Sequence, residues 1–152
     1  MRIGRRRLVA AGAGLLLVVV LAVAAIALVR WRAAGESRAI APPAGATTPP
    51  GYERDVADRA TLIARGLRNE RGEATVRTYA MPAGSPWLQS RQLVATQLDH
   101  WEQVGDCADN PAATIVECAW REPTRWWPRE VRLTMMRLDP GTFVIVGSGV
   151  GD

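Results

Sequence analysis

The chain has 152 residues, of which 48% are hydrophobic, 22% charged and 6% aromatic. This length holds one ordinary domain, and two Cys with one His cannot supply the four ligands of a Cys/His zinc site. The formal net charge is +4, but residues 1–32 carry six Arg and no acidic residue, whereas residues 52–152 carry 12 Arg and 14 acidic residues. A phosphate-binding surface needs many unpaired cations, so we expect no nucleic-acid partner.

Residues 8–29 are an unbroken run of Leu, Val, Ile, Ala and Gly. As a helix this run extends about 33 Å, enough to cross the hydrocarbon core of a bilayer. Four Arg within residues 1–7 outweigh Arg30 and Arg32, so the positive-inside rule predicts a cytoplasmic tail at 1–7 and an extracytoplasmic remainder. We therefore expect a signal-anchor helix that contacts membrane lipid through residues 8–29, with Trp31 at the interface.

A cleaved secretory signal is the alternative to an uncleaved anchor. Ala25 and Ala27 match a small-residue cleavage site, and Arg5–Arg7 resembles a loose twin-arginine signal. The hydrophobic region of a signal peptide has about 7–15 residues, so the longer run here favours the anchor.

Residues 30–51 are rich in Pro, Ala and Gly and contain almost no large apolar side chain. Such a segment cannot bury enough surface to offset its chain entropy. We therefore expect a disordered, partly extended tether between the membrane and an extracytoplasmic domain at residues 52–152.

Within residues 52–152, helical and extended patterns alternate. Apolar side chains share one face over residues 53–68, which predicts a helix. Ser85 and Pro86 are typical of the start of a second helix, predicted over residues 86–103 and ended by Gly105. Patterns rich in alternating apolar positions predict strands over residues 73–81, 113–121, 130–138 and 142–147.

The order of these elements indicates an α+β fold. Asp139–Pro140–Gly141 predicts a tight turn between the last two strands. We expect two layers, with both helices on one face of a four-stranded, mostly antiparallel sheet. The last three strands should form a meander.

Cys107 and Cys118 are the clearest pair of functional side chains. Outside the cytoplasm they would form a structural disulfide that closes a 12-residue loop, worth about 3 kcal/mol in the loop-entropy model. The Cys-x-x-Cys spacing of redox pairs is absent from the sequence, and two free thiols remain the alternative.

His100 and the carboxylates around it are the residues from which a catalytic site would have to be built. His100 lies off the apolar face of its predicted helix, and the sequence has no Gly-x-Ser-x-Gly elbow. We interpret Asp99, Glu102, Asp106 and Asp109 as a solvated helix end because they lack the EF-hand pattern. We expect no catalytic residue, no cofactor and no metal site.

Two segments of the domain remain. Residues 147–151, Gly-Ser-Gly-Val-Gly, are interpreted as a flexible tail because no helix follows that could complete a phosphate-binding loop. Residues 121–129 combine Trp and Arg, which often anchor protein interfaces. Their Trp side chains could instead cover the small core or lie at a membrane surface. For a partner interface, the candidate contacts are Arg125, Trp126, Trp127 and Arg129.

Together these features predict a non-enzymatic, membrane-anchored interaction module of the bacterial envelope, with a protein partner. The absence of Lys beside abundant Arg, Ala and Gly is typical of a high-GC bacterial genome. The alternatives are a small envelope hydrolase that uses carboxylates, and a binder of cell-wall glycan or a small ligand that stacks on Trp.

Overall fold

The computed structural model describes residues 2–49, 54–139 and 141–151. The chain divides into two compact units, residues 1–33 and residues 34–152. Residue 53, where the sequence predicts the start of a helix, and Pro140 of the predicted turn lie outside the described residues.

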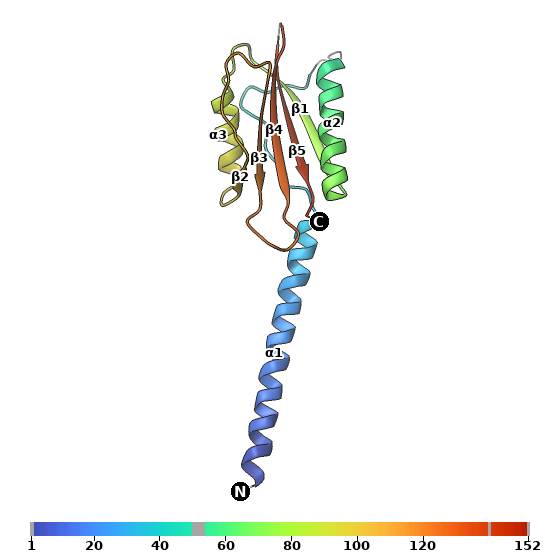
Figure 1. Ribbon diagram of the computed structural model, residues 1–152, viewed down its shortest axis with the longest axis vertical. Coiled ribbons are helices and arrows are strands. Elements are labelled where there is room, and N and C mark those ends of the chain that lie inside the picture. The colour runs from blue at the N-terminus through green and yellow to red at the C-terminus, as the bar shows by residue number, and fades with distance from the viewer. Residues whose placement is uncertain (1, 50–53, 140, 152) are drawn as a thin grey trace. The chain divides into compact units, whose positions relative to one another are not determined.

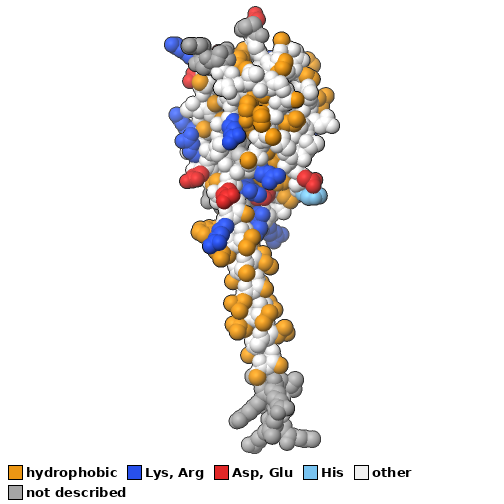
Figure 2. All heavy atoms as spheres, turned by 180° about the vertical axis from the view of Figure 1, so that it is seen from behind, with side chains coloured by type: hydrophobic (Ala, Val, Ile, Leu, Met, Phe, Trp, Pro, Cys, Tyr) orange, Lys and Arg blue, Asp and Glu red, His pale blue; other side chains and the backbone are white. Residues whose placement is uncertain are grey.

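The first unit is helical. Helix α1 has the bounds Arg2–Ala34, so its last residue belongs to the second unit. Within α1, Ala10–Ala34 is long and apolar enough to cross a membrane, with a mean hydropathy of 2.9. Figure 2 shows hydrophobic side chains around the described part of this helix. The predicted span at residues 8–29 therefore coincides with most of an apolar helix that continues beyond Trp31.

The second unit is built on a five-stranded antiparallel sheet with the strand order β1-β5-β4-β3-β2. The predicted meander of the last three strands is confirmed, while a short additional strand, β2, extends it at the edge. The elements of this unit are α2 (Arg54–Arg71), β1 (Ala74–Met81), α3 (Trp87–Gln97), β2 (Glu102–Val104), β3 (Ile115–Arg121), β4 (Glu130–Arg137) and β5 (Thr142–Gly149).

Helices α2 and α3 lie on opposite faces of the sheet (Figure 1). The prediction of both helices on one face is therefore wrong. Strand β5 gives the physical reason, because residues 143–146 are all apolar and a strand points successive side chains to opposite faces. Val144 and Val146 pack on the α3 side, and Phe143 and Ile145 pack on the α2 side.

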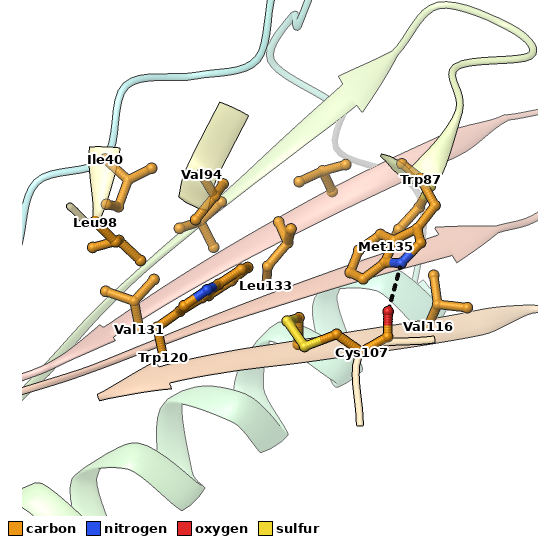
Figure 3. Packing of buried hydrophobic residues seen from close by; sticks show 13 residues of the cluster. Ile40, Trp87, Val94, Leu98, Cys107, Val116, Trp120, Val131, Leu133 and Met135 are labelled. Atoms are coloured by element: carbon orange, nitrogen blue, oxygen red, sulfur yellow. Dashed lines mark hydrogen bonds between the residues drawn. A yellow bond between two sulfur atoms is a disulfide. The ribbon is translucent and has the colours of Figure 1, made fainter. Parts of the chain in front are cut away.

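The larger core lies between the sheet and α3 (Figure 3). Trp87, from the first turn of α3, is fully buried, and its Nε1 donates a hydrogen bond to the Cys107 carbonyl oxygen at 3.4 Å. Burial of such a large side chain together with its N–H partner fixes α3 against the sheet. The sheet side of this core comes from Val116, Cys118, Trp120, Val131, Leu133 and Met135.

Helix α3 is shorter than the predicted helix 86–103. It ends at Gln97, and residues 102–104 join the sheet as β2. Leu98, the C-cap residue, leaves the helical conformation with φ −108° and ψ 43°, well before Gly105. The predicted cap also differs, because Pro86 is the N-cap residue and no side chain accepts a hydrogen bond from the first turn of α3, while the Ser85 hydroxyl donates to the Pro82 carbonyl oxygen.

The predicted disordered tether is wrong for residues 34–49. Ile40, the one large apolar side chain in this stretch, is 6% exposed and belongs to the core beside α3. Thr47 and Ala80 exchange backbone hydrogen bonds of 2.9 Å at the edge of the sheet. A single apolar anchor and an unpaired strand edge are enough to hold a segment whose composition by itself predicts disorder.

The predicted flexible tail is also wrong for its described part. Strand β5 continues through Gly149, and the N–H of Val150 donates to the Glu73 carbonyl oxygen at 3.1 Å. A Cβ on Gly147 would come within 2.7 Å of a methyl group of Leu67. The glycine at position 147 therefore lets α2 pack directly on the strand.

Candidate functional site

Half of one sheet face is left uncovered. Helix α2 packs mainly against β1 and β5, so within the described residues the same face of β2, β3 and β4 is covered only by side chains that reach over from α2. A hollow of about 440 Å³ lies there, which we call the sheet hollow. Its walls come from Arg59, Leu62 and Ile63 of α2 and from Val104 and Asp106 at the β2 edge.

The floor of the sheet hollow is polar. Alternate residues of β3 and β4 point to this face, while the residues between them enter the core beside α3. Each strand is therefore apolar on its α3 side and mostly charged or polar on the other. The floor residues are Glu117, Ala119 and Arg121 from β3, and Glu130, Arg132 and Thr134 from β4.

Glu130 is the electrostatic centre of this floor, since its side chain is 3% exposed and contacts three guanidinium groups. The distances from its carboxylate oxygens to Arg71 Nη2, Arg121 Nη2 and Arg132 Nε are 2.9, 2.9 and 2.8 Å. Burial by itself raises the pKa of Glu130, but hydrogen bonds from Arg121, Arg132 and Arg71 outweigh it and lower the pKa from 4.5 to about 2.

Further ion pairs connect the floor to α2. Arg59 pairs with Glu117, and the Thr134 hydroxyl donates to the same Glu117 carboxylate at 3.2 Å. Arg132 pairs with Glu70 as well as with Glu130. The cations and carboxylates of the floor are therefore joined in a network of shared ion pairs.

Two apolar side chains border this polar floor. Leu62 on α2 is 55% exposed and Val104 on β2 is 39% exposed. Large apolar side chains that border a hollow are candidates for contact with another molecule. Neither these residues nor the floor were predicted from the sequence. The alternation of polar and apolar residues in β4 and the continuous apolar run of β5 both indicate a sheet that is covered unequally on its two faces.

The predicted cysteine pair lies beside this site. Cys107 and Cys118 form a disulfide with a Cα–Cα distance of 4.9 Å. It joins the loop after β2 to the middle of β3, and Cys118 also borders the sheet hollow. The disulfide therefore ties one wall of the hollow to its floor.

The predicted acidic stretch does not form a single cluster. Asp106 lines the sheet hollow, whereas Asp99 and Glu102 are exposed outside its lining and Asp109 pairs with Arg137. The side chain of His100 is 87% exposed, as predicted. Across residues 2–49, 54–139 and 141–151, no group of three or more His, Cys, Asp or Glu could hold a metal ion.

The predicted Trp/Arg contact residues lie in the loop between β3 and β4 and do not line the sheet hollow. Trp126 is 49% exposed, Trp127 is partly buried, and their rings meet edge to face with centroids 6.3 Å apart. Arg125 is exposed, whereas Arg129 pairs with Glu122 at 2.6 Å. The structure thus separates this group into an exposed Trp126 and Arg125 and a more enclosed Trp127 and Arg129.

Comparison of the chain with protein-family models, curated proteins and solved structures finds no match.

Proposed function

We propose that this protein is a membrane-anchored, non-enzymatic interaction module of the bacterial envelope that binds a protein segment in the sheet hollow. Helix α1 is the anchor, and the folded domain lies outside the cytoplasm. The observation that carries the proposal is the sheet hollow beside α2, because the exposed apolar side chains of Leu62 and Val104 border it.

The chemistry of the hollow favours a protein segment as the occupant. Leu62 and Val104 offer apolar contact at the border, and the paired charges of the floor offer directional donors and acceptors. A segment with both apolar and charged side chains would complete the layer that α2 begins. The paired floor charges would set its register more than its affinity.

The hydrolase alternative has less support. Glycoside hydrolysis by carboxylates needs one group that holds a proton near neutral pH. Glu130 has its pKa lowered to about 2 and is held by three Arg, so it stays ionised and cannot serve as that acid. Of the predicted carboxylates, Asp106 alone lines the hollow with it.

Site-specific crosslinking tests the proposal. We expect a photoreactive residue in place of Ala119 to give a discrete protein adduct when the full chain is irradiated in native membranes. Leu62→Arg should reduce the adduct at least about tenfold, equivalent to about 1.4 kcal/mol, because it places an unpaired charge at the border of the hollow.

Leu88→Arg is the matched control, since Leu88 is a similarly exposed leucine, at 60%, on the helix of the opposite face. It should leave the adduct unchanged. Equal adduct yields from the two arginine variants, with equal thermal stabilities, would contradict binding in the sheet hollow.

A further inference from the structure

Ala34 belongs both to the apolar helix and to the folded domain. It is the last residue of the candidate span Ala10–Ala34 and is 2% exposed within the second unit. Its carbonyl oxygen accepts a hydrogen bond of 2.8 Å from the N–H of Gly151. Ala34 is therefore held within the folded domain.

The loop between β3 and β4 lies at the same end of the sheet as Ala34. A Cβ on Gly151 would come within 2.0 Å of the Trp127 carbonyl oxygen and 2.8 Å of the Ala34 Cβ. Arg71 also holds the loop, because its Nη1 donates to the Pro128 carbonyl oxygen at 3.1 Å. The loop is thus packed around the residues through which the chain reaches the span.

Trp126 is the most exposed aromatic residue of this loop. Trp127 has φ 51°, a left-handed conformation that is unusual for a bulky residue and has to be held by its surroundings. Trp126 stands edge-on to it and keeps 49% of its surface exposed. Arg125, next to it, is exposed as well.

We propose that this loop rests on the membrane, with Trp126 among the lipid headgroups and Arg125 beside anionic phospholipid phosphates. Tryptophan is enriched at this depth because its ring is apolar and its N–H is a donor. Arginine near an anionic surface is attracted to it. The proposal rests on the membrane anchor of the proposed function, but it needs no protein partner and does not involve the sheet hollow.

Quenching by brominated lipid tests this contact. The full chain is reconstituted in vesicles of phosphatidylcholine and phosphatidylglycerol, with bromine near the headgroup end of the acyl chains. We expect Trp126→Phe to lose part of the tryptophan quenching that the wild type shows. Arg125→Glu should lower the quenching in these vesicles more than in vesicles of phosphatidylcholine alone.

A tryptophan at the far end of the domain is the control. Leu88 follows the opposite end of β1, which as an eight-residue strand is roughly 25 Å long. Leu88→Trp added to Trp126→Phe should restore no quenching. The lipid contact alone is overturned if wild type and Trp126→Phe are quenched equally and both proteins still float with the vesicles after alkaline extraction. Failure to float overturns the anchor and this proposal together.

Discussion

At the scale of single residues, Glu130 shows how the domain keeps a carboxylate inside its sheet. Its pKa lies at about 2, below the ordinary 4.5, so ionised Glu130 stabilises the fold above pH 4.5. That stability is lost as the pH falls from about 4.5 toward 2. A pKa shift of this size corresponds to about 3 kcal/mol of folding free energy. Because the Glu130 side chain is 3% exposed, solvent screens little of this contribution.

Glu130→Gln should therefore lower the free energy of unfolding by about 3 kcal/mol at neutral pH, because it leaves Arg71 buried without its counter-charge. Denaturant unfolding over the acid range measures this, and the variant should also lose the steep part of the pH dependence below about pH 4.5. Glu73→Gln, at an exposed carboxylate, should change neither quantity. Identical acid profiles for wild type and Glu130→Gln would contradict this role.

At the scale of elements, the contact of α2 with β5 depends on the absence of a side chain at position 147. The sequence alone marks Gly147 only as part of a glycine-rich end, yet its backbone touches Leu67 and Ile63 of α2. Close approach of helix and strand buries both apolar faces without a gap. Helix α2 packs over β1 and β5, and the sheet hollow lies beside it.

Gly147→Ala should destabilise the domain by about 1–3 kcal/mol, because its methyl group overpacks the contact with α2. Gly66→Ala is the matched comparison within α2. There the added Cβ would lie 3.4 Å from an Arg132 nitrogen at the end of a flexible side chain, so the gain in helix propensity, up to about 1 kcal/mol, should prevail. Thermal melts measure both effects. A Gly147→Ala variant that melts at or above the wild-type temperature would show that the close contact is unimportant.

At the scale of the whole molecule, the proposed function depends on which side of the membrane the domain occupies. The asymmetry between the Arg of residues 1–7 and the two that follow the span predicts a cytoplasmic N-terminus. Protease added to intact spheroplasts should then remove a C-terminal tag and spare an N-terminal one. A C-terminal tag that is degraded only after lysis would place the domain inside the cell and end the envelope proposal.

Local pattern was sufficient for several features of this protein. The apolar run at residues 8–29, the helix beginning near residue 54, the antiparallel pairing of the last three strands and the Cys107–Cys118 pair follow from composition, periodicity and spacing. Each depends on side chains near one another in sequence or on a single physical property such as hydropathy.

Only the tertiary structure decided how the layers are arranged. Residues 34–49 are held by a core that other segments build, and residues 102–104 become a strand because β3 offers them an edge. The sheet hollow lies beside α2, which packs on β1 and β5, and the ion pairs of its charged floor join residues up to 62 positions apart. Such contacts depend on which distant segments compete for the same surface, and local periodicity carries no information about that competition.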